Sequence, residues 1–484
     1  MNTMKIKPVL LTYCLIILAL TGCDKQYDFD LGEFPPVVYD EKYKGYEENP
    51  FVKVTTEPVS TFSVDADGGS YANMRRYLYL GQTPPKASVR IEEYINYFTF
   101  DYQEPTSGEN VSLESEISTC PWNAKNYLLR LGIKGLTIPA NDLPNSNYVF
   151  LIDVSGSMNS PDKLGILKIG FKTLTDNLRD QDRISIVTYA GDAGILLESA
   201  YGSEKDKIKS AIDKLGAGGS TAGAAGITTA YEIAQKNFIV NGNNRVILGT
   251  DGDFNVGPST TDELVKLIEE KRQTGIYLTV LGVGEGNLND HMMEQIANKG
   301  NGNYEYIDNA KQIQKVFTYE LTKFYTIAKD SKIQLTFNQN MIESYRLIGY
   351  ENRKLDSEEF ENDSTDAGEI GSAQTITALY EVVLLDASNK EKYAQFEFRY
   401  KKPNETQSQL ITHDISMIPK EINSCSENMR FAASVTGLGL LMKQSKYKRG
   451  LTKQMVLDLG EKATTFDPNG YRKEFIELVK NWND

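Results

Sequence analysis

The pattern of apolar and polar positions is most regular in the middle of the chain. Between residues 145 and 328, short apolar runs alternate with stretches in which apolar residues recur every three or four positions. The short runs are typical of strands buried on both faces, and the spaced residues are typical of helices with one buried face. We predict strands at 147–153, 183–189, 245–250, 277–283 and 303–307, a hairpin strand at 195–199, and helices at 163–178, 205–215, 222–238, 261–274, 290–298 and 309–325.

This alternation predicts an α/β domain with a doubly wound, mostly parallel sheet and helices on both faces. In such sheets ligands bind beyond the carboxyl ends of the strands, where the strand order reverses. The first strand and the strand that ends at Thr250 should flank that point, because a polar loop follows each of them. A binding site is therefore expected where these two loops meet.

The segments on either side of the α/β domain have strand-like patterns. Residues 111–144 alternate in this way, and similar patterns return at 332–337, 375–385 and 393–400, within the C-terminal part 329–484. Strands before and after an α/β unit predict that the unit is inserted into a β-sandwich formed by both flanks.

Helical patterns complete the two flanks. Residues 51–110 form a small region with two short amphipathic helices, and the C-terminal part ends in further helices, one of them at 471–482. Just before the first helix lies Asp65-Ala66-Asp67-Gly68-Gly69-Ser70. It lacks the later Asp or Asn position and the closing Glu of an EF-hand, so a turn that caps the helix is the favoured interpretation.

The N-terminus has the pattern of an export signal. Two lysines precede an apolar run from Val9 to Leu20, which is too short to span a bilayer permanently. The run ends in Leu20-Thr21-Gly22-Cys23, which resembles the lipobox of bacterial lipoproteins. That resemblance implies that residues 1–22 are removed, that Cys23 carries lipid, and that the protein is anchored in the cell envelope. We expect the outer membrane, with the protein facing the periplasm or the surface; an uncleaved anchor is the alternative.

Residues 23–50 are rich in Tyr, Asp and Glu without a sustained period, which predicts an acidic tether. Of the four cysteines, Cys14 would leave with the signal and Cys23 would be lipidated. Cys120 and Cys425 remain, one in each flank. Outside the cytosol a disulfide between them is permitted, and two buried free thiols are the alternative.

The candidate chemistry lies in the loop after the first strand of the α/β domain. Asp153, Ser155 and Ser157 alternate there, and Gly156 lets the backbone curl. Oxygen ligands without sulfur or imidazole suit a hard divalent cation. The same residues are also common in turns and at helix N-termini.

Two distant stretches extend this pattern. Thr221 follows Gly218-Gly219-Ser220 at the start of a predicted helix, and Asp251 follows the strand that ends at Thr250. The positions read Asp-x-Ser-x-Ser, Thr, Asp. This resembles the metal-ion-dependent adhesion site (MIDAS) of the von Willebrand factor type A (VWA) family. The surrounding sequence and both flanks resemble a bacterial branch of exported lipoproteins that carry this domain.

The resemblance implies that Ser155, Ser157 and Thr221 contact a metal directly, while Asp153 and Asp251 act through water or hold the hydroxyls. Neutral ligands leave the ion much of its charge, so that a carboxylate from a partner can complete its coordination. The small ligand set favours Mg²⁺, and Mn²⁺ and Ca²⁺ are compatible. A hydrogen-bonded cluster without metal is the alternative.

We therefore expect a lipid-anchored, metal-dependent binding protein that engages an acidic group on another protein or on a glycan-bearing surface. The alternative is an envelope assembly or scaffolding factor whose flanks make the main contacts and whose metal site is regulatory. A metallohydrolase needs a general base, and the resemblance already gives Asp153 and Asp251 other roles, so no enzyme is predicted. The net charge of −14 argues against a nucleic-acid partner.

Overall fold

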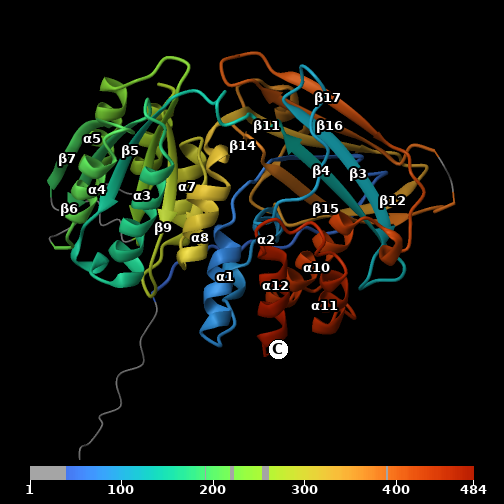
Figure 1. The fold of residues 1–484 in the computed structure, drawn as a ribbon. Helices are drawn as coiled ribbons and strands as arrows, with labels where there is room; N and C mark the ends of the chain where they lie inside the picture. The colour runs from blue at the N-terminus through green and yellow to red at the C-terminus, as the bar shows by residue number, and fades with distance from the viewer. Residues whose placement is uncertain (1–39, 191, 219–222, 253–260, 389–390, 484) are drawn as a thin grey trace, which may run out of the picture. The chain divides into compact units, whose positions relative to one another are not determined.

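The α/β domain is built on a sheet of strand order β10-β9-β8-β5-β6-β7 (Figure 1). Every neighbouring pair is parallel except β6 and β7, which confirms the predicted mostly parallel sheet. The computed structural model describes residues 40–190, 192–218, 223–252, 261–388 and 391–483. The strands are β5 (Ser146–Asp153), β6 (Arg183–Ala190), β7 (Asp192–Tyr201), β8 (Asn243–Thr250), β9 (Tyr277–Gly282) and β10 (Tyr304–Tyr306).

Helices cover both faces of this sheet. In the central strand β5, Val149 and Leu151 enter one apolar core, whereas Phe150 and Ile152 enter the other. Both faces of β5 are buried, which is why its central residues Tyr148 to Ile152 form an unbroken apolar run. One core includes α5 (Gly223–Lys236), α6 (Thr261–Arg272) and α7 (Asp290–Lys299), and the other includes α3 (Ile166–Asn177), α4 (Lys205–Asp213) and α8 (Ala310–Gln314).

The helix predicted at 309–325 is interrupted. After α8 the backbone forms a π-helical turn at Lys315–Tyr319 and a 3₁₀ turn at Leu321–Phe324. The N–H of Glu320 donates to the carbonyl of Lys315 at 2.9 Å, a five-residue step. This wider turn lets the ammonium of the buried Lys315 pair with the Glu320 carboxylate. The spacing of apolar residues does not predict such an ion pair, so the interruption of the helix was not expected.

A β-sandwich formed by both flanks holds the α/β domain, as predicted. Its sheets have the orders β1-β12-β15-β4-β3 and β13-β2-β11-β16-β17, with β14 paired to β11. Each sheet contains strands from before and after the α/β domain. The strands are β1 (Val52–Lys53), β2 (Val59–Ser63), β3 (Val111–Thr119), β4 (Tyr127–Gly135), β11 (Thr326–Phe337), β12 (Ile342–Ile348), β13 (Lys354–Leu355), β14 (Gly368–Gly371), β15 (Thr375–Leu384), β16 (Ala394–Lys401) and β17 (Gln409–Ile415), with helix α9 (Ser357–Glu361) beside them.

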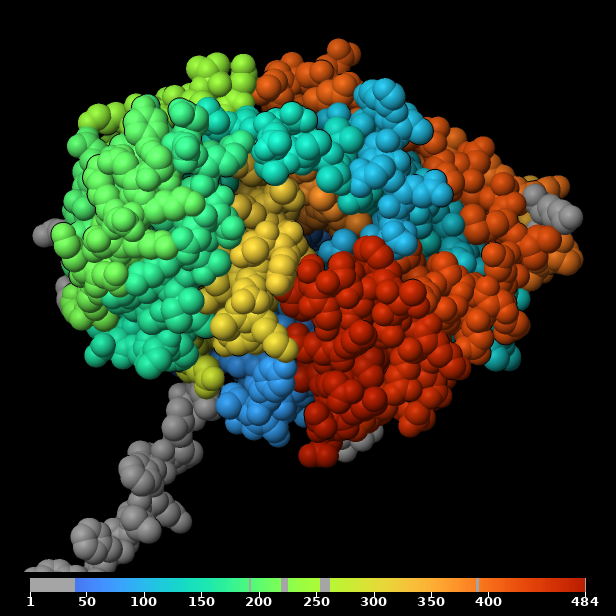
Figure 2. Space-filling view, viewed as in Figure 1, coloured from blue at the N-terminus to red at the C-terminus, as the bar shows by residue number. Residues whose placement is uncertain are grey.

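A helical layer lies against the sandwich. Phe98, Phe431 and Phe475 pack edge to face at its centre, with ring centroids 4.9 to 5.7 Å apart. The C-terminal helices lie next to the N-terminal helix α1 in Figure 2. Residues 51–110 thus supply the short strands β1 and β2 as well as two helices. The helices of this layer are α1 (Gly69–Tyr79), α2 (Ile91–Asn96), α10 (Glu427–Met442), α11 (Lys453–Glu461) and α12 (Tyr471–Asn481).

The last residues of the predicted tether contact the folded body. The carboxylate of Glu41 accepts two hydrogen bonds of 2.8 Å from Arg76 and one of 2.6 Å from the Tyr77 hydroxyl. The chain is therefore held in place from about residue 40, whereas the tether was predicted to extend to residue 50. The cause is that the buried guanidinium of Arg76 needs an acidic partner, which Glu41 provides. Cys23 and residues 1–39 lie outside the described residues.

Cys120 and Cys425 are both buried and free in this structure. Both belong to the core beneath the C-terminal helices. Burial raises the pKa of the Cys425 thiol to about 11, with a further contribution from the charge of Glu116. Among the helices of the described chain, none has the length and apolar character needed to cross a bilayer.

Candidate metal site at the ends of β5 and β8

Asp153 connects the loop after β5 to the end of β8, the two places that were expected to form the binding site. It is the last residue of β5, which pairs in parallel with β8, and its side chain is fully buried. One carboxylate oxygen accepts the backbone N–H of Ser155 at 2.9 Å, and the other accepts the hydroxyl of Thr250 at 3.1 Å. The loop after β5 is thereby fixed to the end of β8.

The two serines of the motif lie side by side. The hydroxyl oxygens of Ser155 and Ser157 are 3.0 Å apart, and the Ser157 hydroxyl is hydrogen-bonded to the carboxylate of Asp251. Ser155 is buried and Ser157 is exposed, so the group opens to solvent on one side. The structure therefore brings Asp153, Ser155, Ser157 and Asp251 together, while Thr221 lies outside the described residues.

These residues fit a small hard cation. Every donor is an oxygen, with no imidazole or thiol among the four described side chains. Neighbouring ligands of octahedral Mg²⁺, at about 2.1 Å from the ion, are roughly 3 Å apart, and the two serine hydroxyls already have that spacing. Without an ion, the same distance is an ordinary hydrogen bond.

Lys163 is a charged neighbour that the sequence analysis did not assign to the site. Its ammonium lies 3.0 Å from Oδ2 of Asp251 and donates to Oδ1 of Asn287 at 2.8 Å. Asn287 in turn donates to the same Asp251 oxygen at 3.1 Å. The only signal in the sequence was that Lys163 begins the predicted helix 163–178, directly after the loop that carries Asp153.

The lysine reaches this position because a glycine leaves room for it. Gly284 has φ +79°, and a Cβ atom there would lie 2.4 Å from side-chain carbons of Lys163. Any larger residue would therefore both strain the backbone and displace the lysine. The turn after β9 thus contributes to the site through the space that it leaves open.

The pKa values of the Asp153 and Asp251 carboxylates are shifted in opposite directions. Burial alone would raise the pKa of Asp251, but hydrogen bonds from Asn287, Lys163 and Ser157 and the charge of Lys163 lower it overall. Burial raises the pKa of Asp153, and the charge of Asp251 adds to that effect. Among the residues that the structure describes, Asp251 has a positively charged neighbour in Lys163, whereas Asp153 has none.

Comparison with protein families matches three consecutive parts of the chain. The profile described as von Willebrand factor type A domain matches residues 147–318, which is the α/β domain with the site described above. The profiles described as von Willebrand factor and as Uncharacterized protein YfbK, C-terminal match residues 37–130 and 322–484. The fold and these matches define a VWA-domain protein with recognisable flanks on both sides.

A curated relative extends this match to almost the full length. The chain is 41% identical over 465 residues to Uncharacterized protein YfbK of Escherichia coli (strain K12), which covers 91% of this chain and 80% of that protein. The chain therefore belongs to the YfbK family of VWA-domain proteins.

Two further similarities are more distant. The chain is 27% identical over 243 residues to Magnesium-chelatase 67 kDa subunit of Chlorobaculum tepidum, which covers 44% of this chain and 39% of that subunit. Among solved structures, von Willebrand factor type A from Catenulispora acidiphila aligns with a TM-score of 0.47 at 16% identity, covering 79% of this chain and 91% of that one.

Proposed function

We propose that this protein is a binding protein that uses Mg²⁺ held at the MIDAS to engage a carboxylate on a partner protein. The contact between Lys163 and Asp251 is the main support. If Asp153, Asp251 and Lys163 are all charged, these side chains carry one net negative charge. A divalent ion beside them would keep about one net positive charge, which favours an acidic ligand from outside.

The hydrogen bonds of the site support binding over catalysis. A hydrolase that activates a metal-bound water needs a free carboxylate or imidazole as its general base. The Asp251 carboxylate is engaged by Lys163, Asn287 and Ser157, and both oxygens of Asp153 accept hydrogen bonds from the protein. Magnesium-chelatase activity is not carried over, because the chain covers 39% of that subunit.

Metal-dependent capture tests this function. The full-length protein, carrying an affinity tag, would be cross-linked in cells and purified in 5 mM Mg²⁺ or in EDTA. We expect one or more acidic proteins to be captured only with Mg²⁺, and to be lost in Asp153→Ala. The matched control is Asp176→Ala, which removes an exposed carboxylate on α3.

The outcome can contradict the proposal. Capture that is unchanged by EDTA and by Asp153→Ala would favour the scaffolding alternative, in which the flanks make the contacts. Calorimetry measures Mg²⁺ binding directly, beside the capture experiment. Binding should be present in the wild type and in Asp176→Ala, and absent in Asp153→Ala.

We also propose that Cys23 anchors the protein to the outer membrane through lipid. The support is the sequence Leu20-Thr21-Gly22-Cys23 at the end of an apolar run. In a detergent phase-separation assay, the wild type should enter the detergent phase and Cys23→Ser should not be processed to the same mature form. Equal partition and equal size of the two proteins would contradict lipidation.

A further inference from the structure

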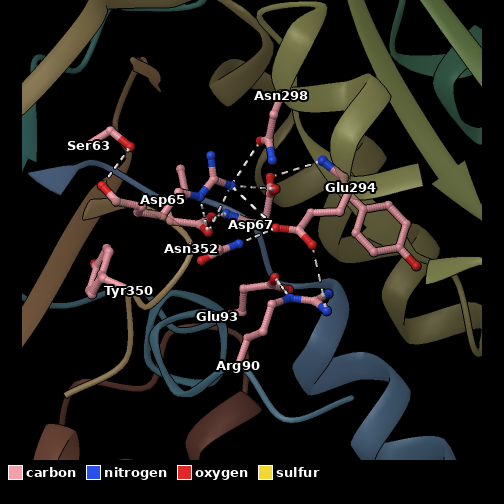
Figure 3. A network of polar contacts seen from close by, with 12 residues as sticks. Ser63, Asp65, Asp67, Arg90, Glu93, Glu294, Asn298, Tyr350 and Asn352 are labelled. Atoms are coloured by element: carbon pink, nitrogen blue, oxygen red, sulfur yellow. Dashed lines mark hydrogen bonds and ion pairs between the residues drawn. The ribbon is translucent and has the colours of Figure 1, made fainter. Parts of the chain in front are cut away.

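A polar network connects the N-terminal flank to helix α7 of the VWA domain (Figure 3). Arg353 donates to Asp65 of the flank and to Asn298 of α7, each at 2.9 Å. Arg90, just before α2, forms an ion pair with Asp290, the first residue of α7. Buried polar networks of this kind restrict the relative position of the elements that they join. The loop between β9 and α7 is therefore held at its C-terminal end.

The loop Asp65-Ala66-Asp67-Gly68-Gly69-Ser70 belongs to this network and does not act as the helix cap that the sequence favoured. Gly68 is the N-cap of α1, and no side chain caps it. The backbone N–H of Ser70 instead donates to Glu93 of α2 at 2.7 Å. Helix α1 is thereby placed beside the VWA domain, where it contacts β10.

A second connection between the N-terminal flank and the VWA domain lies closer to the candidate metal site. Residues 40–43, called the strap here, run along the loop between β9 and α7. The N–H of Asp40 donates to the carbonyl of Gly286 at 2.7 Å, and the N–H of Lys42 donates to that of Leu288 at 2.8 Å. The strap therefore holds this loop by backbone hydrogen bonds on both sides of the residue that lies between the two carbonyls.

The carboxylate of Glu41 fixes the strap in place. It accepts the backbone N–H of Gly286 at 2.9 Å and two hydrogen bonds of 2.8 Å from Arg76 of α1. The hydroxyls of Tyr43 and Tyr77 each donate to it at 2.6 Å. One carboxylate thus joins the strap, the loop and helix α1, and none of these contacts involves a predicted metal ligand.

Asn287, the residue between the two bonded carbonyls, contacts the candidate metal site. Its side-chain amide donates to Oδ2 of Asp251 at 3.1 Å, and its Oδ1 accepts from the ammonium of Lys163 at 2.8 Å. A displacement of Asn287 would remove one hydrogen bond from the Asp251 carboxylate. It would also remove one support from the lysine that pairs with that carboxylate.

We propose that the strap regulates the metal site through Asn287, an inference that rests on the proposed binding of Mg²⁺ at the MIDAS. While the strap is attached, Asn287 and Lys163 engage the Asp251 carboxylate and weaken its attraction for the ion. When the strap is released, Asp251 attracts Mg²⁺ more strongly, and the ion keeps less charge for the partner's carboxylate. Residues 40–43 directly follow most of the predicted tether in the chain, so a pull on the tether acts first on the strap.

Calorimetry of Mg²⁺ binding to the full-length protein in detergent tests this coupling. Glu41→Ala removes every side-chain hydrogen bond that fixes the strap. We expect the Mg²⁺ affinity to rise about fivefold, the effect of about one hydrogen bond at Asp251. Lys42→Pro, at an exposed position, removes the N–H that donates to Leu288 and should act in the same direction.

A double-mutant cycle separates this coupling from general destabilisation. Asn287→Ala should raise the Mg²⁺ affinity by a similar factor, and Glu41→Ala should then add nothing further, because both substitutions act through one contact.

Glu48→Ala is the matched control. It removes a carboxylate of the same N-terminal segment that accepts hydrogen bonds from Ser445 and Lys446, away from the metal site. This variant should melt at a lower temperature and keep the Mg²⁺ affinity of the wild type.

Two results would overturn the strap. One is an unchanged Mg²⁺ affinity in Glu41→Ala and Lys42→Pro, and the other is a full sum of the effects of Glu41→Ala and Asn287→Ala in the double variant. If Glu41→Ala does not unfold cooperatively, the Lys42→Pro titration decides. A wild type that binds no Mg²⁺ would contradict the proposed function itself, and the strap with it.

Discussion

Lys163 and Asp251 form an ion pair of 3.0 Å between the π-helical turn Pro161–Gly165 and the loop after β8. Both side chains are largely buried, so solvent screens this pair only weakly. The pair supplies a positive charge next to the predicted metal ligands. It makes the site less negative, and under the proposed function it would set both how strongly the ion is held and how much charge the ion keeps.

Lys163→Met should strengthen Mg²⁺ binding and weaken the partner's binding. Removing the ammonium leaves the Asp251 charge free to attract the ion, and we expect an affinity gain on the order of tenfold. The protein without Mg²⁺ should melt at a lower temperature, because an uncompensated carboxylate remains buried. Calorimetry checks the affinity, and Lys207→Met on the exposed surface is the control. A weaker or unchanged Mg²⁺ affinity would contradict this role for Lys163.

Gly284→Ala should reproduce part of the Lys163→Met effect. The new methyl group would lie 2.4 Å from the lysine side chain and force it away from Asp251. Gly81→Ala is a matched control, since Gly81 has φ +70° and nothing within 4 Å of an added Cβ. Each substitution should cost about 1 kcal/mol of backbone strain, measured by denaturant unfolding. Gly284→Ala should cost more and alter Mg²⁺ affinity, and equal effects of the two would exclude the proposed displacement.

Glu41 should make stability depend on pH in acid. Burial would raise its pKa, but hydrogen bonds from Arg76, Tyr43 and Tyr77 outweigh this effect and lower the pKa to about 2. Its folded-state pKa is below its unfolded value, so the stabilisation is complete above about pH 4.5 and is lost as the pH falls towards 2.

Urea unfolding of Glu41→Gln against pH tests this window. The stability difference from the wild type should be largest at neutral pH and should shrink towards pH 2. Glu57→Gln, at an exposed position, provides the comparison. A difference that does not vary with pH would show that packing, and not charge, accounts for the contact.

The thiols of Cys120 and Cys425 should react slowly in the folded protein. Burial raises the pKa of both, that of Cys425 to about 11, so little thiolate is present at pH 8. Alkylation of Cys425 by iodoacetamide should be roughly a hundredfold slower than in urea, as followed by peptide mass spectrometry. Labelling in urea that requires prior reduction would instead show that the two cysteines pair.

The fold was predictable wherever the burial of a segment imposes a regular spacing of its apolar residues. The strands β5, β8, β9 and β10 are buried along almost their whole length, so apolar runs marked them, and β5 began within one residue of its expected start. The strands β1 and β2 were not predicted, because they are short and take their partners on β12 and β11 from far along the chain, Tyr345 for Val52 and Lys332 for Ser63. Such pairing has no local signature.

The candidate metal site was likewise only partly predictable from the sequence. Asp153, Ser155, Ser157 and Asp251 could be proposed because their spacing follows strand ends. Lys163 could not, since its contacts with Asp251 and Asn287 depend on side chains from distant segments. The sequence also could not show that Glu41 is fixed to Arg76, because an acidic, proline-containing stretch favours a tether until its partner is known.

The insertion of the VWA domain between β4 and β11 has a consequence for the order of folding. Strand β2 is made early, but its neighbour β11 is separated from it by the whole VWA domain. Neither half of the sandwich can close its sheets until the inserted domain has left the ribosome. The VWA domain, whose strands are contiguous in the chain, is free to fold first and to bring the two halves within reach of each other.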